Sequence, residues 1–392
     1  MMIYLIAMAS FGYLGLAFWQ VARFKSSAPI DREAPTAQPM ISVMRPLCGA
    51  EPRLYECLRS FCVQTYPHYE LIFGVSDPMD PAVAVVMRLR RRFPSLEISL
   101  VVNSRTHGAN PKVSNLLNMI DRCQHDVLVV ADSDVCAPPD LVADLAHALA
   151  PPGVGAATTL YTGVATGGWV SRLGALWIND FFLPSALVDI GLNEVDGCYG
   201  PVTAIRRQTL EEVGGFAALK DYLAEDNRLG RLVRARGLRL VLNTKPAPTM
   251  VNPQRFLDLF QHELRWARTV RACRPFDHVL SVITYPLPLM LLALGTAPST
   301  LGLTVVGLHV ILRMLLNALI HQRVAATGPA SPLWVPVREC VSFMVWAVSL
   351  GGTRVVWRNR EYELRTGGFL VPRVAQVLAV EPAIGVGSEA QS

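Results

Sequence analysis

Two carboxylates one residue apart are the strongest chemical signal in the sequence. Asp132 and Asp134 follow the apolar residues 129–131 and are separated by one serine. In a turn after a strand both side chains can converge on one hard cation, because Mg2+ and Mn2+ prefer oxygen ligands and a diphosphate can supply the remaining ones. Like charges this close are unfavourable unless a positive group lies between them. The pair therefore predicts a metal site at Asp132 and Asp134, with a solvated turn as the alternative.

Three further polar side chains stand where strands end or helices begin. Asp77 follows the strand predicted over residues 69–75 and could accept a hydrogen bond from a uracil N–H; a simple turn is the alternative. Lys112 begins a helix, where the helix dipole disfavours a cation, so we expect a phosphate or carboxylate partner. Asp226 follows Glu225 in the first turn of another helix, where acidic residues are favoured by the helix dipole. The alternative is that Asp226 is a general base, which requires its pKa to be raised by desolvation or by Glu225.

The segment of residues 261–271, QHELRWARTVR, mixes basic and aromatic residues on one predicted helix. Arg265 can bind phosphate oxygens with two parallel hydrogen bonds, and Trp266 offers a flat face to a sugar or a lipid. The same composition is typical of a helix at a membrane interface, which is the alternative interpretation.

Strands and helices alternate after residue 40, which predicts an α/β domain with a mostly parallel central sheet. In such sheets ligands bind outside the carboxyl ends of the strands, where Asp77 and Asp132 are expected. The predicted strands span residues 41–44, 69–75, 97–102, 126–131, 155–161 and 198–205, and the predicted helices span 52–64, 81–93, 111–123, 141–149, 169–188, 224–236 and 256–274, with another after residue 208.

The chain is too apolar for an ordinary soluble enzyme, with 51% hydrophobic and 17% charged residues and a mean hydropathy of +0.32. Residues 2–22 carry no charge and are long enough to cross a bilayer. Basic residues follow immediately, which predicts a cytoplasmic C-terminal end for this segment. We therefore expect a transmembrane anchor over residues 1–25, a Pro/Ala-rich linker over 26–39 and a cytoplasmic catalytic domain over 40–275.

A second membrane region is predicted over residues 276–353. Two spans are expected at about 279–297 and 300–320. Arg313 and Asn317 lie near the end of the second span, where we expect them to snorkel to the interface, with a functional charge inside the membrane as the alternative. Residues 333–352 carry two charges near their start, Arg338 and Glu339, so we expect an interfacial or re-entrant segment there. The basic residues 354–392 form an expected cytoplasmic tail, so an even number of crossings must separate them from the catalytic domain.

Charge and cysteine content exclude some partners. The net charge is +5, but no nucleic-acid-binding motif or interleaved aromatic platform is present, so nucleic acid is not an expected partner. The anionic phosphates of a small ligand or of lipid headgroups fit the basic clusters better. The eight cysteines show no zinc-binding spacing, and on the cytoplasmic side we expect them to be reduced.

The motifs in chain order resemble one enzyme family, the ceramide glucosyltransferase-like glycosyltransferases. Within that group RPLCGAEPRLYECLRSFC, HGANPKVSNL and HELRWARTVRA are most similar to the bacterial hopanoid-biosynthesis glycosyltransferases. The C-terminal WRNREYEL also resembles the family pattern, and the resemblance extends to about residue 370. The residues that carry it are Asp77, NPK at 110–112, DSD at 132–134, AED at 224–226 and HELRW at 262–266.

The resemblance implies a GT-A-like domain, a UDP-sugar donor and a lipid acceptor. For the hopanoid branch these are UDP-N-acetylglucosamine and a bacteriohopanepolyol, with Mg2+ or Mn2+ as cofactor and a multi-pass location in the bacterial inner membrane. By this resemblance Asp226 is the catalytic base, and Asp132 and Asp134 bind the metal and diphosphate. The resemblance also implies donor contacts from Asp77, Lys112, Arg265 and Trp266, with His262 and Trp266 at the acceptor.

The family usually has Gln or Arg where this chain has His262, a departure consistent with a different sugar or acceptor. Which sugar and lipid are used depends on a pocket shaped by residues 169–193 and 196–201. A ceramide glucosyltransferase using UDP-glucose is the alternative within the family. An inactive nucleotide-sugar-binding membrane protein is the alternative from another class, although every candidate carboxylate is present. A transporter is disfavoured by the long soluble insert, and a processive polysaccharide synthase by the few expected spans.

Overall fold

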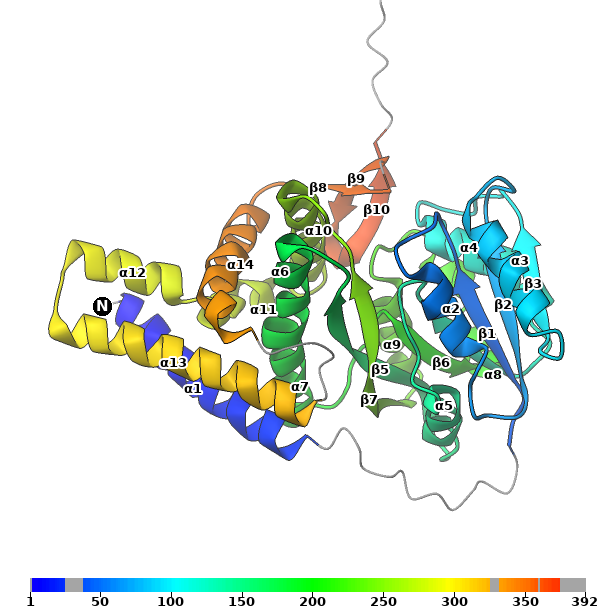
Figure 1. Ribbon diagram of the computed structural model, residues 1–392, viewed down its shortest axis with the longest axis horizontal. Coiled ribbons are helices and arrows are strands. Elements are labelled where there is room, and N and C mark those ends of the chain that lie inside the picture. The colour runs from blue at the N-terminus through cyan, green and yellow to red at the C-terminus, as the bar shows by residue number, and fades with distance from the viewer. Residues whose placement is uncertain (1, 25–37, 325–330, 359, 374–392) are drawn as a thin grey trace, which may run out of the picture.

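A seven-stranded sheet forms the centre of the computed structural model, which describes residues 2–24, 38–324, 331–358 and 360–373 (Figure 1). Strand β6 runs antiparallel to both of its neighbours, and the other neighbouring strands are parallel. The sheet is therefore mostly parallel, as predicted. In spatial order the strands are β3 Ile98–Val102, β2 Tyr69–Val75, β1 Ile41–Pro46, β4 Val127–Ala131, β6 Val202–Arg206, β5 Val154–Ala165 and β7 Arg239–Val251.

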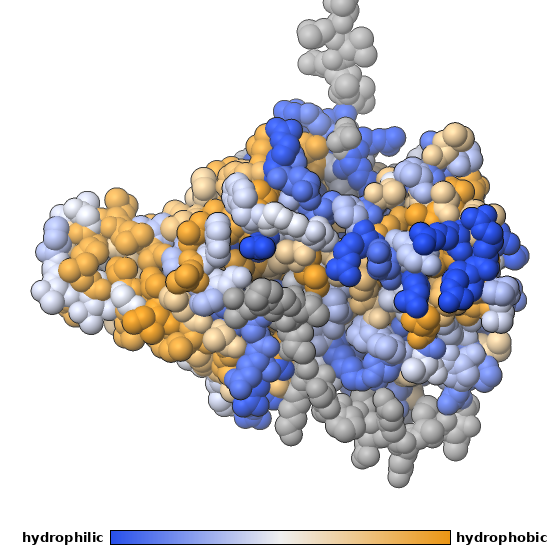
Figure 2. Space-filling model, in the orientation of Figure 1, coloured by the Kyte–Doolittle hydropathy of each residue, from blue (hydrophilic) through white to orange (hydrophobic). Residues whose placement is uncertain are grey.

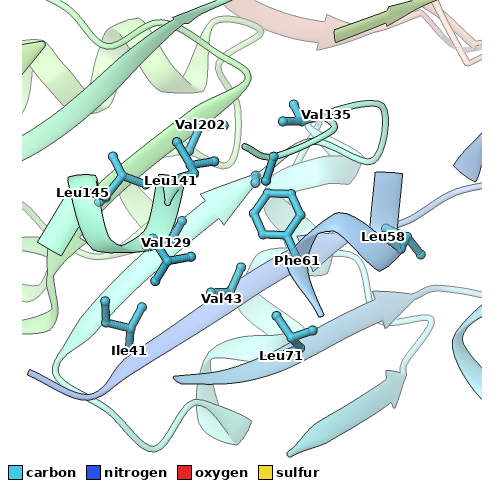
Figure 3. Close-up of a cluster of buried hydrophobic side chains, with 14 of the residues drawn as sticks. Ile41, Val43, Leu58, Phe61, Leu71, Val129, Val135, Leu141, Leu145 and Val202 are labelled. Atoms are coloured by element: carbon cyan, nitrogen blue, oxygen red, sulfur yellow. The ribbon is translucent and has the colours of Figure 1, made fainter. Parts of the chain in front are cut away.

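Apolar side chains cover both faces of the sheet, so helices pack on both sides. On one face Val43, Leu71 and Val129 from neighbouring strands pack with Phe61 and Leu141 (Figure 3). The helices on that face are α2 Leu54–Phe61, α3 Ala82–Arg92 and α5 Leu141–Leu149, and those on the other are α4 Pro111–Met119, α8 Arg207–Glu212 and α9 Glu225–Ala235. This arrangement brings the carboxyl ends of β1, β2 and β4 to one edge.

The edge strand β7 was missed by the sequence analysis. It contains Pro246 and Pro248, which argue against a strand because proline cannot donate a ladder hydrogen bond. The strand is tolerated because β7 lies at the edge of the sheet, where it pairs with β5 on one side and forms a single bridge, from Thr249 to Val135, on the other.

The helix predicted over residues 169–188 is interrupted by a π-helical turn. Its parts are α6 Trp169–Trp177, the π-turn η2 Ile178–Phe182 and α7 Leu183–Leu192. The whole segment is long and apolar enough to cross a membrane, but 67% of its most apolar window is buried inside the protein. It packs against β5, where Gly163 allows close approach: a Cβ there would lie 2.8 Å from the Cα of Ala175.

The apolar helices gather at one end of the molecule, away from the sheet (Figure 1). Hydrophobic residues dominate the surface over α12 and α13 in Figure 2. Helices α1 Met2–Arg23 and α13 Thr300–Arg323 are each long and apolar enough to span a membrane. Helix α11 Pro275–Leu280 and the turn η4 Ser281–Thr284 form, with α12 Leu287–Thr296, a pair bent by 58°, and α14 Val335–Ser349 follows.

The expectation that Arg313 and Asn317 snorkel to the interface is wrong. Both are buried, with 3% and 0% exposure. Asn317 donates to both carboxylate oxygens of Asp180 at 2.9 and 3.0 Å, and Arg313 lies 3.6 Å from Glu339. Buried charges require such partners. The partners come from η2 and α14, far away in sequence, so no local pattern around α13 reveals them.

The expected C-terminal tail begins as a folded sheet. Strands β8 Arg354–Trp357, β9 Arg360–Arg365 and β10 Phe369–Pro372 form an antiparallel sheet next to α10 Phe256–Cys273. Its backbone bonds to the catalytic part: the N–H of Leu223 donates to Gly368 at 2.9 Å and that of Leu370 donates to Asp221 at 2.7 Å. Strand β10 and the turn before it are therefore bonded directly to the chain just before α9.

Candidate active site

The loop after β4 holds Asp132 and Asp134 at the carboxyl edge of the sheet. The N–H of Asp132 donates to the carbonyl of Pro201 at 2.9 Å, in the chain that leads into β6. Beneath the loop, the fully buried Arg45 donates to the carbonyls of Asp132 at 2.7 Å and Ser133 at 3.1 Å. Burial lowers the pKa of Arg45 to about 10, while nearby thiols and the two carboxylates oppose the shift. Arg45 thus places positive charge under the paired carboxylates.

Lys112 connects two carboxylates from distant parts of the chain. Its Nζ lies 2.5 Å from Oδ1 of Asp132 and 2.7 Å from Oε1 of Glu225. Asn110 positions the start of α4, because its Oδ1 accepts from the N–H of Val113 at 3.0 Å. Burial lowers the pKa of Lys112, but the two carboxylates more than offset burial and raise it. The cation at the helix start therefore has anionic partners.

Asp226 lies in the first turn of α9, beside Glu225. Burial, followed by the charge of Glu225, raises the pKa of Asp226 to about 7, against the opposing effect of Lys112. The chain near Tyr199 passes close by, since a Cβ on Gly200 would lie 3.1 Å from Oδ2 of Asp226. A carboxylate that titrates near neutral pH can accept a proton during catalysis.

The sequence analysis missed Glu51 and did not predict the partner of Glu225. Glu225 pairs with Lys112 and accepts a longer hydrogen bond, 3.3 Å, from Nδ2 of Asn110. Glu51 accepts from the hydroxyl of Ser133 at 3.2 Å. The position of Lys112 at a helix start was the only local sign of an acidic partner, and it could not identify Glu225.

Helix α10 adds Arg265, His262 and Trp266. Burial lowers the pKa of Arg265 to about 10, and the charges of Glu225 and Asp132 oppose this shift, which places Arg265 within their electrostatic reach. Burial and Arg265 lower the pKa of His262 to about 3, so the imidazole is neutral at pH 7. Its ring lies 4.3 Å from that of Trp266. Within the described residues, the guanidinium of Arg265 has no ion-pair partner at the site.

The rotation of α10 is fixed by Glu263, a residue of the HELRW motif that points away from this cluster. Glu263 is 3% exposed and forms a double hydrogen bond with the fully buried Arg338 of α14, at 2.8 and 2.7 Å. The buried pair orients the helix that carries Arg265 and Trp266.

Asp77 stands apart from the other predicted site residues. It is exposed after β2, and its Oδ1 accepts from the N–H of Met79 at 2.8 Å in a local turn. Its neighbour Asp80 accepts from the N–H of Ala82 at 2.8 Å and so caps α3. The described contacts thus join Lys112, Asp132 and Glu225 but leave Asp77 at the same edge without a contact to them.

The donor set of the DSD loop fits a hard cation. Oδ1 of Asp134 is buried and has no hydrogen-bond partner in the described parts of the chain. Burial and the neighbouring charge of Asp132 raise the pKa of Asp134 well above its usual range, as expected for a carboxylate that needs a positive partner. No group of three or more His, Cys, Asp or Glu side chains suited to a metal occurs among the described residues. A cation here would therefore take further oxygens from a bound ligand.

Several known proteins are similar to this chain in sequence or in fold. The model of glycosyl transferase family 21 matches residues 2–370. Ceramide glucosyltransferase 3 of Caenorhabditis elegans is 24% identical over 362 residues, which cover 85% of this chain and 74% of that protein. A ceramide glucosyltransferase of Candida albicans is 34% identical over 109 residues, 25% of this chain and 20% of that protein.

A solved structure confirms the expected GT-A-like fold. The mannosyltransferase PcManGT from Pyrobaculum calidifontis, in complex with GDP-Man and Mn2+, aligns with a TM-score of 0.54. The alignment covers 89% of this chain and 99% of that one at 20% identity.

Proposed function

The chain belongs to glycosyl transferase family 21, and from the geometry of its site we propose that it transfers a sugar from a UDP-sugar to a hydroxyl group of a lipid. The observation that carries the proposal is the cluster in which Lys112 bridges Asp132 and Glu225, beside Asp226. It lies at the carboxyl edge of a mostly parallel sheet, where such folds bind ligands.

In this proposal the donor lies across the sheet edge. Asp77 accepts a hydrogen bond from the uracil, and Lys112 and Arg265 face the diphosphate. Asp132 and Asp134 would hold Mg2+ or Mn2+, and the cation, when bound, offsets negative charge on the diphosphate. The unpartnered Oδ1 of Asp134 and the unpaired guanidinium of Arg265 support this assignment, because both need a partner of opposite charge.

Asp226 is the proposed general base. It takes the proton of the acceptor hydroxyl, whose oxygen attacks the anomeric carbon and forms the new glycosidic bond. The bond from that carbon to the diphosphate oxygen breaks, and its electron pair leaves with UDP. A single displacement inverts the configuration of the sugar. A pKa of about 7 leaves Asp226 partly ionised at neutral pH, as this role requires.

We propose a bacteriohopanepolyol as acceptor and UDP-N-acetylglucosamine as donor, with His262 and Trp266 near the acceptor. The neutral His262 in contact with the ring of Trp266 supports an uncharged acceptor at that point. Ceramide with UDP-glucose is the second candidate. It is favoured by the names of the relatives, which are ceramide glucosyltransferases matched over up to 85% of this chain.

The proposed topology places the catalytic domain on the cytoplasmic face of a bacterial inner membrane. Residues 1–25 anchor the chain, residues 26–39 link the anchor to the domain over 40–275, and residues 276–353 form the membrane region. Because Gly368 and Leu370 bond to Leu223 and Asp221, an even number of crossings separates the C-terminal strands from the domain in this topology. Helix α13 and the bent pair over residues 275–296 supply two, and α14 then stays interfacial.

One experiment tests the proposed reaction and separates the two acceptors. The purified protein in detergent is incubated with radiolabelled UDP-N-acetylglucosamine or UDP-glucose and with either bacteriohopanetetrol or ceramide, and the labelled lipid is identified by mass. We expect one lipid product in wild type and none in Asp226→Asn, with donor binding retained in the variant. Donor binding without transfer to any lipid in wild type would favour the inactive binding protein instead.

A further inference from the structure

Five half-buried aromatic rings lie in contact beside the candidate active site. The ring of Trp266 lies 5.1 Å from that of Trp177, and Trp177 lies 6.1 Å from Phe182. Phe182 stacks on Tyr161 at 4.5 Å and meets Tyr199 edge-on at 5.9 Å. All five keep part of their surface exposed. We call these five residues the aromatic wall.

One end of the aromatic wall reaches the proposed base. Burial, followed by the charges of Asp226, Asp134 and Asp132, raises the pKa of Tyr161, so this phenol lies within the field of all three carboxylates. Tyr199 is followed by Gly200, whose missing Cβ leaves room for the carboxylate of Asp226. A ligand that contacts Tyr161 therefore lies close to Asp226.

The other side of the wall continues into the membrane helices. Phe182 and Tyr199 pack against a buried apolar cluster that includes Leu14 of α1 and Leu316 of α13. Phe182 also belongs, with Trp177, Trp266 and Tyr161, to the apolar residues around Ile178. Apolar packing is thus continuous from the two candidate spans, through Phe182, to Tyr161.

The π-turn holds the central rings in place. Asn179 bonds both backbone groups of Gly163 on β5, accepting from its N–H at 2.8 Å and donating to its carbonyl at 3.0 Å. The next residue, Asp180, accepts from Asn317 of α13. Trp177 and Phe182 flank these two anchors, so their rings are fixed relative to both the sheet and the span. π-Turns occur frequently at functional sites.

We propose that the aromatic wall is the subsite for the apolar body of the lipid acceptor and leads the acceptor hydroxyl from the membrane to Asp226. This rests on the proposed function. The wall presents large apolar faces and no charged side chain, so it suits a fused-ring or alkyl body near an uncharged hydroxyl group. The cations that suit a diphosphate, Lys112 and Arg265, lie with the carboxylate cluster instead.

The test compares Trp177→Ala with Trp177→Phe and with Phe256→Ala. Phe256 is a matched control, because its ring also lies in an aromatic stack, with Trp169, at the far end of α10. KM is measured for the lipid and for the UDP-sugar with whichever pair wild type uses. We expect Trp177→Ala to raise the KM for the lipid about tenfold, with the KM for the UDP-sugar unchanged and Trp177→Phe within about twofold of wild type.

A binding measurement accompanies the kinetics. Ceramide and bacteriohopanetetrol brominated near the headgroup quench the fluorescence of nearby tryptophans, and the difference between wild type and Trp177→Phe isolates Trp177 among the seven tryptophans. We expect this difference signal to be quenched by the lipid that is the substrate, and not by the UDP-sugar.

The outcomes separate this inference from the proposed function. A rise in the KM for the UDP-sugar alone, or a Trp177→Ala variant no different from Phe256→Ala, overturns the acceptor subsite while transfer stands. Quenching at Trp177 in a protein that transfers to neither lipid supports the subsite and refutes the transfer reaction. Absence of both quenching and transfer refutes the two together.

Discussion

The rate of transfer should depend on pH through Asp226, and its neighbour Glu225 should set the midpoint. Burial and the charge of Glu225 raise the pKa of Asp226 from 3.8 to about 7. A base acts only when ionised, so kcat/KM should rise with pH and level off above about pH 8. Glu225→Gln removes the like charge next to Asp226, so the midpoint should move to lower pH.

The expected size of the change in rate follows from the pKa of Asp226 in wild type and in Glu225→Gln. With a pKa of about 7, roughly one tenth of Asp226 is ionised at pH 6 and roughly one hundredth at pH 5. A nearby like charge is worth about one pKa unit or more. Glu225→Gln should therefore shift the midpoint to about pH 6 and make the variant several-fold less sensitive to acid than wild type.

The same shift affects stability. Folded Asp226 holds its proton up to about pH 7, whereas the unfolded chain releases it near 3.8. The folded state therefore binds more protons between these values, and the free energy of unfolding falls as pH rises through them, by on the order of 4 kcal/mol in total. Asp226→Asn removes this cost, so it should raise the melting temperature at pH 8 and change it little at pH 4.

The assay records initial rates of UDP release with the lipid acceptor between pH 5 and 9, together with thermal melts. Glu212→Gln is the matched control, because it removes one acidic charge from an exposed side chain that accepts a hydrogen bond from Gln208 on its own helix. An unchanged midpoint in Glu225→Gln, or wild-type turnover in Asp226→Asn, would refute the assignment of Asp226 as the base.

Three further predictions concern other charged residues of the protein. Lys112→Gln should move the midpoint of the pH profile upward, because Lys112 lowers the pKa of Asp226; a downward move contradicts the geometry. Asp134→Ala should weaken donor binding only when Mn2+ is present, measured by calorimetry with and without EDTA, and equal loss in EDTA would remove the metal. Arg338→Ala should lower the stability by about 3–5 kcal/mol in chemical unfolding, and adding Glu263→Ala should recover part of it.

The sequence predicted six of the seven strands of the central sheet, because those strands are defined locally. The strand over residues 69–75 and the helix over residues 141–149 have the predicted bounds, since a short apolar run and an amphipathic period depend only on neighbouring residues. The position of Asp132 directly after a strand was predicted for the same reason. Family membership, now established, was likewise predicted from motifs in chain order.

Other features depend on contacts between distant segments and could not be predicted. Arg313 was expected at an interface because it lies near the end of a predicted span. Its partner Glu339 lies on another helix and could not be predicted from the span. Glu225 was taken as part of a charged helix start, although Lys112 from a separate helix pairs with it. The π-turn that follows Trp177 and ends at Phe182 leaves no clear periodicity of apolar residues in the sequence.

The sequence by itself determined the alternation of strands and helices, the apolar segments and the acidic residues at element ends, because each is set by the local pattern of side chains. Only the tertiary structure decided which of those charges meet, which are buried, and where the aromatic rings lie. The physical reason is that burial and opposite charge act through space, so the pKa of Asp226 and the pairing of Arg313 depend on neighbours brought together by folding.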